Sequence, residues 1–440
     1  MTSLTITPGR SLKGTITVPG DKSVTHRAII LTALAEGTST VSNYCRGEDC
    51  LNTIRAFQAL GVRIDETLDQ LTVYGKGFWG LAEPNGPIDC GNSGTGIRLL
   101  SGLLAGQDFF TVLTGDESIR RRPMGRVVRP LREMGAVIAG RKGGELAPLA
   151  ITGTRLHGID YLSPVASAQI KSSLLLAGLF AEGTTRLREP RLSRDHTERM
   201  FQFFGIPLTR DGSALVLQGR PAVGWAGKRV VVPGDFSAAA FFLVGATLVP
   251  GSDLTIRNVG INPTRTGLLD VMKMMGADIQ MFNQREEAGE PVADLRVKAA
   301  PLKGVAIGSD LIPQTIDEFP ILCVAAAMAQ GDTLISGAEE LRVKESDRIA
   351  AMSTELQAMG AQLTEKPDGM IIHGLGRSGE NGRLKAADKA RSHGDHRVAM
   401  SLAIGGLTAD TRMTIADTDC VETSFPNFEA VLSALLTHHP

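Results

Sequence analysis

The 440-residue sequence predicts an α/β protein made of two similar domains. Helix-like and strand-like segments alternate throughout the chain, and glycines break them at regular intervals. The segment VPGDKS at 18–23 recurs as VPGDFS at 232–237, and an apolar helical run follows each copy. This long-range duplication indicates two related halves, each built from smaller repeats.

A second pattern divides each half into repeats. Helical runs meet a glycine and then a strand-like segment in ALGVRI, EMGAVI, FFGIPL, MMGADI and AMGAQL. Their glycines lie 70 to 84 residues apart, at Gly61, Gly135, Gly205, Gly276 and Gly360. A glycine after a helical run is a C-cap signal, and the β-rich letters after it predict a strand. With a further set of apolar helices, the last at 399–407, this spacing predicts six units of two helices alternating with strands.

The two ends of the chain complement each other. The sixth unit ends in a helix at 427–436 with no strand after it, whereas the first residues supply strands that belong to no unit. We therefore expect an inserted domain at 21–233 and a second domain at 1–18 plus 236–440, each of three repeats. Paired linkers between similar domains make a cleft that can close over ligands. The alternative is one continuous solenoid of six units, which the three-unit separation of the VPGD copies disfavours.

Composition excludes several classes of protein. With 46 basic and 47 acidic residues, the net charge of −1 is unlike that of a nucleic-acid binder, and 5% aromatic residues leave few stacking platforms. Five cysteines without a CxxC pair predict neither a disulfide framework nor a zinc ribbon. No signal, transit or membrane-spanning segment is recognisable. We expect a cytoplasmic protein without nucleic-acid or membrane partners.

The segment PGDKSVTHRA predicts an anion site at a helix N-terminus. Lys22, Ser23 and Arg27 can lie on one side of the first turns, where backbone N–H groups and the helix dipole favour negative charge. The second VPGD copy has Phe236 and Phe241 at the Lys22 and Arg27 positions, so the first copy looks specialised. A plain N-cap with a solvated lysine and arginine is the alternative.

Other helix starts in the first half offer further anion contacts. The glycine-rich CGNSGTGIR can cradle a carboxylate or phosphate at Gly94, although tight-turn packing is the alternative. Among the six arginines of RRRPMGRVVRPLR, Arg122 precedes a proline that restrains its backbone, which makes it the preferred clamp. Ser167 and Gln169 begin a helix, where Ser167 could be an ordinary N-cap. Arg194 precedes another helix and suits a phosphate, with a capping box as the alternative.

The second half adds both cations and carboxylates. Lys344 and Arg348 are four residues apart, and on one helical face they repel unless an anion lies between them; a salt-bridged surface is the alternative. Glu345 lies between them. Asp317 precedes a strongly apolar helix and could be a cap or a general base. Arg397 follows SHGDH, whose two histidines are weak evidence for a metal, and we expect none.

These motifs resemble those of the 5-enolpyruvylshikimate-3-phosphate synthase (3-phosphoshikimate 1-carboxyvinyltransferase) family, in the family's order and from end to end. They are PGDKSVTHRA, GNSGTGIR, RRRPMGR, SAQIKSSLLLAGL, SRDHTERM, RVKESDR and GDHRVAM. The resemblance implies an inverse α/β prism of two domains, each of three βαβαββ-type repeats, joined by a double hinge. It also implies transfer of the enolpyruvyl group of phosphoenolpyruvate to the 5-hydroxyl of shikimate 3-phosphate, with release of phosphate, in aromatic amino-acid biosynthesis.

The resemblance further implies which residues bind the substrates. The contacts to shikimate 3-phosphate would be Lys22, Ser23, Arg27, Ser167, Ala168 (by its backbone), Gln169, Arg194, Asp317 and Lys344. The contacts to phosphoenolpyruvate would be Lys22, Gly94, Arg122, Gln169, Arg348 and Arg397. Many bacterial relatives also use a lysine in the C-terminal loop, where Thr423 of VETSFP stands here, as in the second class of these synthases. That departure leaves one anion contact open.

The chemistry needs a base for the hydroxyl and an acid for the enol methylene carbon. We assign these roles to Asp317 and Glu345, with Lys22 assisting, and expect a monomer that uses no cofactor. One alternative is the related UDP-N-acetylglucosamine enolpyruvyl transferase, whose reactive loop cysteine has no evident match here. Another is an inactive anion-binding protein of the same fold, which would not need the two carboxylates.

Overall fold

The structure, a computed structural model, describes residues 2–221, 224–376 and 382–437. The chain divides into two compact units. Unit 1 comprises Met1–Pro19, Gly234–Arg285 and Pro291–Pro440, and unit 2 comprises Gly20–Pro233 and Glu286–Glu290. The short segment Glu286–Glu290 falls in the range that the sequence assigns to the other domain, because nothing in its letters shows which neighbours it packs against.

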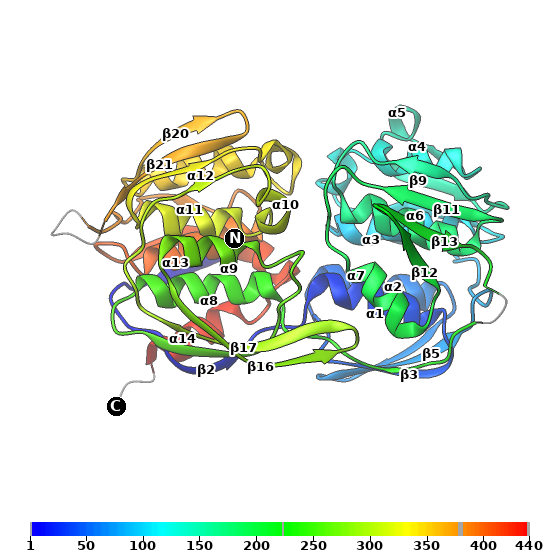
Figure 1. Cartoon of the computed structure of the whole chain (residues 1–440), viewed down its shortest axis with the longest axis horizontal. Helices are drawn as coiled ribbons and strands as arrows, with labels where there is room; N and C mark the ends of the chain where they lie inside the picture. The colour runs from blue at the N-terminus through cyan, green and yellow to red at the C-terminus, as the bar shows by residue number, and fades with distance from the viewer. Residues whose placement is uncertain (1, 222–223, 377–381, 438–440) are drawn as a thin grey trace. The chain divides into compact units, whose positions relative to one another are not determined.

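Unit 2 is a succession of βαβαββ repeats (Figure 1). The first contains α1 (Lys22–Ala33), β3 (Glu36–Ser42), α2 (Glu48–Ala59), β4 (Arg63–Glu66) and β5 (Gln70–Lys76). The second contains β6 (Ile88–Asp89), α3 (Gly94–Ala105), β7 (Phe110–Thr114), η1 (Ile119–Arg121), α4 (Gly125–Glu133), β8 (Val137–Gly140), α5 (Arg141–Gly144) and β9 (Leu146–Thr152). The third contains β10 (Asp160–Leu162), α6 (Ala168–Phe180), β11 (Thr184–Arg188), α7 (His196–Phe204), β12 (Leu208–Asp211) and β13 (Ala214–Gln218), and β14 (Arg229–Val231) closes the unit.

Each repeat of unit 2 builds one sheet with the same strand order. The sheets are β14-β3-β5-β4, β6-β7-β9-β8 and β10-β11-β13-β12. The first pair of each is parallel and the other pairs are antiparallel. A parallel pair needs a crossover connection, and a helix supplies it within a repeat. In the first sheet, β14 returns from the end of the unit to take the first position.

Unit 1 repeats this plan with strands taken from both ends of the chain. Its elements are β1 (Ser3–Ile6), β2 (Lys13–Thr17), α8 (Phe236–Leu248), β15 (Asp253–Gly260), α9 (Gly267–Met275), β16 (Asp278–Glu287), β17 (Glu290–Lys298), β18 (Ala306–Ile307), α10 (Ile312–Thr315), α11 (Phe319–Ala327), β19 (Gln330–Ile335), η2 (Glu339–Val343), α12 (Arg348–Ala358), β20 (Gln362–Lys366), β21 (Gly369–Leu375), β22 (Ala390–Arg391), α13 (His396–Gly406), β23 (Met413–Ala416), η3 (Thr418–Thr423) and α14 (Phe428–Thr437). The sheets are β16-β17-β15-β2, β18-β19-β21-β20 and β1-β23-β22. Strand β2 pairs in parallel with β15, and β1 pairs antiparallel with β23, where Leu4 faces Ile415.

Two helices at the centre of unit 1, α8 and α11, are buried along their whole length. In α8 all 13 residues are buried, and Figure 1 shows α8, α9, α11 and α13 between the strands β2, β16 and β17 and the strands β20 and β21. A helix surrounded by protein needs no polar face, which explains the uninterrupted apolar letters of AAAFFLVGATL. The breaks after the helices are as expected: Gly205 and Gly276 follow α7 and α9 with φ of 79° and 96°, a conformation that favours glycine. Among the described residues, no helix has both the length and the apolar character to span a membrane.

Candidate active site

The start of α1 presents Lys22 next to a carboxylate. Asp21 caps the helix by accepting a hydrogen bond from the backbone N–H of Val24 at 2.9 Å. The Nζ of Lys22 lies 3.0 Å from Oδ2 of Asp49 on α2, and both side chains are mostly buried. The ammonium is thereby held at the helix N-terminus, which is where the sequence predicts an anion.

Arg27 lies one turn further along α1 and ties three helices together. Its Nε donates to the Thr197 hydroxyl at 2.6 Å, one terminal nitrogen donates to the Ser172 hydroxyl at 2.6 Å, and the other donates to the Ser23 carbonyl at 2.8 Å. Burial and the nearby charge of Arg194 lower the pKa of Arg27 to about 10, while acidic neighbours act in the opposite direction. The side chain stays cationic at neutral pH, and a second guanidinium, that of Arg194, lies within its electrostatic reach.

A second group of residues surrounds Gly94 at the start of α3. Arg98 donates to Oε1 of Gln169 at 2.8 Å, and Gln169 donates to the Thr95 hydroxyl at 3.1 Å. Arg122 donates to Oδ1 of Asn92 at 3.1 Å. A Cβ on Gly94 would lie 2.8 Å from a terminal nitrogen of Arg122 and 2.9 Å from one of Arg98. Any larger residue at position 94 would therefore displace one or both of these guanidinium groups.

Several expectations about unit 2 can be compared with these contacts. Arg122 has an extended backbone, with φ −72° and ψ 142°, as its position before Pro123 predicts. Ser167 is the N-cap of α6 and accepts from the N–H of Ile170 at 3.5 Å, so the ordinary capping role is present. Ala168 and Gln169 follow as the first residues of that helix. Asp195 precedes α7 without making a side-chain cap, so the capping box suggested by the sequence does not form.

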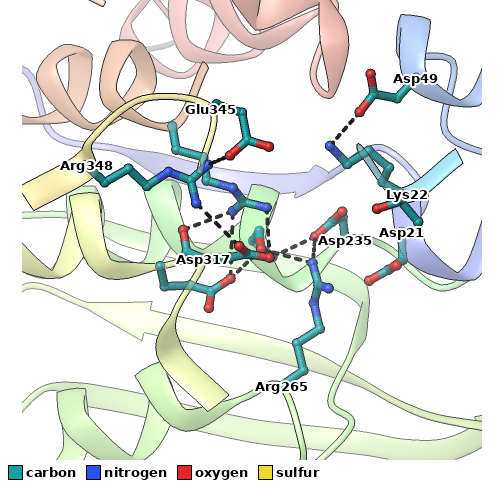
Figure 2. Close-up of polar contacts among 12 residues, drawn as sticks. Asp21, Lys22, Asp49, Asp235, Arg265, Asp317, Glu345 and Arg348 are labelled. Carbon is teal, nitrogen blue, oxygen red and sulfur yellow. Dashed lines mark hydrogen bonds and ion pairs between the residues drawn. The ribbon is translucent and has the colours of Figure 1, made fainter. Parts of the chain in front are cut away.

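In unit 1, Arg348 is surrounded by carboxylates (Figure 2). Its Nε lies 2.8 Å from Asp395, one terminal nitrogen lies 2.7 Å from Glu345, and the other lies 3.4 Å from Asp317. Arg348 is the first residue of α12 and Asp395 is the N-cap of α13, so the starts of two helices meet here. Burial by itself lowers the pKa of Arg348, but the carboxylates outweigh burial and hold the pKa above its ordinary value.

Arg397 joins this group from α13. One terminal nitrogen lies 3.3 Å from Oδ2 of Asp317, and the other donates to the Asp317 backbone carbonyl at 3.1 Å. The carboxylate of Glu318 lies 4.0 Å from Arg397. The predicted base Asp317 and acid Glu345 thus both contact arginines that were predicted to bind phosphoenolpyruvate. This arrangement combines proton-accepting groups with a dense positive charge, as an acid–base reaction between anions requires.

Lys344 belongs to the same group, but not for the reason that its spacing suggests. It follows η2 and precedes α12, so the prediction that Lys344 and Arg348 share one helical face is wrong. The chain is non-helical there because Asp347 caps α12, accepting from the N–H of Ala350 at 3.0 Å. Burial lowers the pKa of Lys344; Asp317 and Glu345 partly offset this, and Arg348 adds to it. The lysine is therefore close to the predicted acid and base.

A buried ion pair beside this group was not predicted from the sequence. Asp235 of the second VPGD segment pairs with Arg265 at 2.7 Å, and Arg265 also donates to the Ser237 hydroxyl at 2.9 Å. Ser237 in turn donates to Glu318. This VPGD copy has no lysine next to Asp235, so it gave no sign of an ion pair. The partner of Asp235, Arg265, lies 30 residues further along the chain. An arginine in NPTRTG, between a strand and a helix, was the available signal.

Thr423 of the C-terminal loop and His393, one of the two histidines considered for a metal, both have partners within the protein. The Thr423 hydroxyl donates to the Cys420 carbonyl at 2.7 Å at the end of η3. His393 pairs with Glu355 at 2.6 Å. Among residues 2–221, 224–376 and 382–437, no group of three or more His, Cys, Asp or Glu side chains could hold a metal ion. The contacts therefore suggest a site built from cations, amide groups and carboxylates.

One protein family matches almost the whole chain. Residues 6–432 match the family described as EPSP synthase (3-phosphoshikimate 1-carboxyvinyltransferase). The chain belongs to the EPSP synthase family. The resemblance inferred from the motifs is thereby confirmed, and with it the conclusion that the chain is a transferase of the shikimate pathway.

Individual members of the EPSP synthase family match over almost their whole length. The 3-phosphoshikimate 1-carboxyvinyltransferase of Geobacter sulfurreducens is 56% identical over 98% of this chain and 99% of its own. That of Geobacter metallireducens is 54% identical over 98% of this chain and 99% of its own. An EPSP synthase structure from Acinetobacter baumannii superposes with a TM-score of 0.89 at 46% identity, covering 99% of both chains.

A more distant structure supports the fold alone. The enolpyruvyl transferase NikO from Streptomyces tendae superposes with a TM-score of 0.79 at 17% identity, covering 98% of this chain and 97% of its own. Together with the close EPSP synthase match, this likeness confirms the predicted α/β fold of two similar sets of βαβαββ repeats.

Proposed function

We propose that this member of the EPSP synthase family uses Asp317, Glu345 and Lys22 for proton transfer in its reaction. The chain transfers the enolpyruvyl group of phosphoenolpyruvate to the 5-hydroxyl of shikimate 3-phosphate and releases phosphate. The observation that carries the assignment is the contact of both Asp317 and Glu345 with Arg348. Acid, base and anion-binding cation thus lie within one connected group.

The proposed steps follow from what each side chain can do. Asp317 accepts the proton of the 5-hydroxyl as its oxygen attacks C2 of phosphoenolpyruvate, and Glu345 protonates the methylene carbon. In the tetrahedral intermediate the bond between C2 and the phosphate oxygen then breaks, and the leaving phosphate takes up the proton that Asp317 accepted, with Lys22 assisting this transfer. Glu345 takes a proton back from the methyl carbon as the enol double bond reforms. Arg348 and Arg397 can donate paired hydrogen bonds to carboxylate or phosphate oxygens, which offsets the repulsion between the two anions.

Unit 2 supplies the other contacts of the proposal. Shikimate 3-phosphate binds Lys22, Ser23, Arg27, Ser167, Ala168, Gln169 and Arg194, together with Asp317 and Lys344 of unit 1. Phosphoenolpyruvate binds Lys22, Gly94, Arg122 and Gln169, together with Arg348 and Arg397 of unit 1. The clustering of Arg98, Arg122 and Gln169 around Gly94 supports the second group, and the proximity of Arg27 and Arg194 supports a phosphate in the first.

Phosphate release from phosphoenolpyruvate tests this proposal directly. Purified protein with a metal chelator should release phosphate with shikimate 3-phosphate and not with UDP-N-acetylglucosamine. Release with the nucleotide sugar would assign the chain to the sister activity. No release with either acceptor would favour an anion-binding protein and contradict the roles of Asp317 and Glu345.

The Gly94→Ala variant should bind phosphoenolpyruvate more weakly. The added Cβ would approach Arg122 and Arg98 to 2.8 Å and 2.9 Å, so these guanidinium groups must move. Loss of one hydrogen bond to a charged group costs about 1.5–3 kcal/mol of binding free energy, and partial relaxation of the flexible arginine side chains reduces this cost. We expect a several-fold higher KM for phosphoenolpyruvate, with an unchanged KM for shikimate 3-phosphate. Gly212→Ala, at an open turn of the same unit, controls for general effects, although its φ of 59° adds strain.

The Lys344→Arg variant should extend activity to higher pH. Burial lowers the pKa of Lys344, so its charge is lost at a lower pH than that of an ordinary lysine. An arginine stays charged there. We expect kcat/KM for shikimate 3-phosphate to fall at a higher pH in the variant than in the wild type. Identical alkaline limbs in the two pH profiles would show that Lys344 does not control this limb.

A further inference from the structure

A buried lysine of α6, Lys171, has no part in the reaction described above. Its side chain is 2% exposed, and Nζ lies 2.8 Å from Oε1 of Glu189 and 2.8 Å from Oε1 of Glu198. It also donates to the backbone carbonyl of Ser193 at 3.2 Å. A buried ammonium is costly unless carboxylates and hydrogen bonds compensate it. Two of its contacts here, Glu189 and Ser193, lie in the segment between β11 and α7, and the third, Glu198, lies in the first turn of α7.

Glu189 completes the attachment of that segment. It accepts from the backbone N–H of Ser193 at 3.2 Å and from the Ser193 hydroxyl at 2.5 Å. Lys171 and Glu189 therefore hold the carbonyl, the N–H and the side chain of one residue. That residue directly precedes Arg194, so its backbone sets where the Arg194 side chain begins.

The neighbouring row of contacts holds the other arginine. The hydroxyl of Ser172, which follows Lys171, lies 2.7 Å from the hydroxyl of Thr197, which precedes Glu198. Both hydroxyls accept hydrogen bonds from Arg27. Because Arg27 and Arg194 are like charges within electrostatic reach, they repel each other when no anion is bound. Holding the two guanidinium groups close to each other against this repulsion therefore requires that both side chains are attached rigidly. The pairs Lys171–Glu198 and Ser172–Thr197 join α6 to α7 at that place.

We propose that Lys171 is a positioning residue that holds Arg194 beside Arg27 and so sets the preference for a 3-phosphorylated acceptor over unphosphorylated shikimate. The inference rests on the proposed function, in which Arg194 binds the 3-phosphate. Lys171 acts through the Ser193 backbone and touches neither substrate. Its loss should therefore weaken phosphate recognition without changing the chemical step.

A double-mutant cycle of Lys171→Met and Arg194→Ala tests this inference. With shikimate 3-phosphate, Lys171→Met should raise KM about tenfold, since small displacements of a binding group cost factors of this order, and leave kcat and the KM for phosphoenolpyruvate within twofold. The ratio of kcat/KM for shikimate 3-phosphate to that for shikimate should fall by the same factor. In the Arg194→Ala background, Lys171→Met should change KM less than twofold.

Two further variants separate positioning from stability. Lys171→Met leaves Glu189 and Glu198 without their cation and can therefore impair folding. The double variant Lys171→Met/Glu198→Gln restores the local net charge and replaces the single variant in that case. It should show the same raised KM for shikimate 3-phosphate. Lys228→Met removes another lysine of unit 2, which donates to the Phe203 carbonyl of α7 and does not contact Ser193, and it should leave KM unchanged.

The outcomes distinguish the inference from the proposed function. If Arg194→Ala raises KM for shikimate 3-phosphate but Lys171→Met does not, or if Lys171→Met has its full effect in the Arg194→Ala background, the positioning role is wrong. If Arg194→Ala itself leaves KM and the preference over shikimate unchanged, the phosphate assignment of Arg194 fails and the inference fails with it, whereas phosphate release would still establish the reaction.

Discussion

Replacing Asp317 with asparagine should lower kcat by about 10²–10⁴-fold, the usual contribution of a positioned acid or base. The amide has the shape of the carboxylate but cannot accept the proton of the 5-hydroxyl. It can still accept hydrogen bonds from Arg348 and Arg397, which lie 3.4 Å and 3.3 Å from the carboxylate. We therefore expect both substrates to bind with affinities close to those of the wild type.

Steady-state phosphate release, with calorimetric titration of each substrate, measures this separation of turnover from binding. Asp332→Asn is a matched control, because Asp332 is an exposed carboxylate of unit 1 that pairs with His373 at 2.9 Å. Its turnover should be unchanged. Normal turnover in Asp317→Asn would refute the assignment of Asp317 as the base, while a loss of binding equal to the loss of turnover would give it a role in binding only.

Replacing Arg348 with methionine should have the largest effect on stability. The side chain is 1% exposed and compensates Asp317, Glu345 and Asp395, of which Asp395 is completely buried. Removing one partner from a buried ion pair costs about 3–5 kcal/mol, because the remaining charge is left uncompensated. The variant should also lose most of its affinity for phosphoenolpyruvate. Denaturant unfolding monitored by circular dichroism measures the first effect.

The pH dependence of this loss identifies its electrostatic origin. Burial by itself raises the pKa of Asp395, but Arg348 outweighs burial, so the pKa lies below its ordinary value. In the wild type this carboxylate therefore stabilises the fold above the unfolded-state pKa of about 3.9, and the contribution is lost as pH falls through the lower folded-state pKa. Without Arg348, burial should raise the pKa above the unfolded value. The variant can then relieve its cost by protonation, so its deficit should be smaller at pH 5 than at pH 8.

A surface arginine provides the contrast. Arg296 pairs with Asp253 at 2.7 Å, but its side chain is 44% exposed. Exposed pairs contribute about 0–1 kcal/mol, so Arg296→Met should hardly change the free energy of unfolding. If Arg348→Met were no more destabilising than Arg296→Met, or if its deficit were the same at both pH values, the carboxylates around Arg348 would have to be compensated by other groups.

The repeats were predictable because glycine and apolar periodicity are local signals. Helix ends at Gly205 and Gly276 could be inferred from the letters, since a left-handed residue after a helix favours glycine whatever its tertiary surroundings. The strand orders could not be read in this way, because β14 and β2 pair with strands distant in sequence. The grouping of the short segment Glu286–Glu290 with unit 2 likewise depends on contacts between residues distant in sequence.

The candidate site shows the same division. Residues in recognisable motifs, such as Lys22, Arg122 and Arg348, could be named from sequence alone. Asp235 and Arg265 could not be paired, because an ion pair between separate elements leaves no periodic trace. The prediction that Lys344 shares a helical face with Arg348 was wrong, since a capping residue at Asp347 delays the start of the helix by one turn.

The pairing of β1 with β23 and of β2 with β15 also determines the order in which the two units can be completed during synthesis. A ribosome makes Ser3–Thr17 before unit 2 and Met413–Ala416 after it, so β1 has no partner while the intervening residues are made. Unit 2, whose sheets use only strands between Gly20 and Pro233, can form these sheets while the later residues are still being made. Strands β1 and β2 thus belong to the unit that is completed after unit 2, and until then their unpaired edges are open to incorrect partners, including other nascent chains.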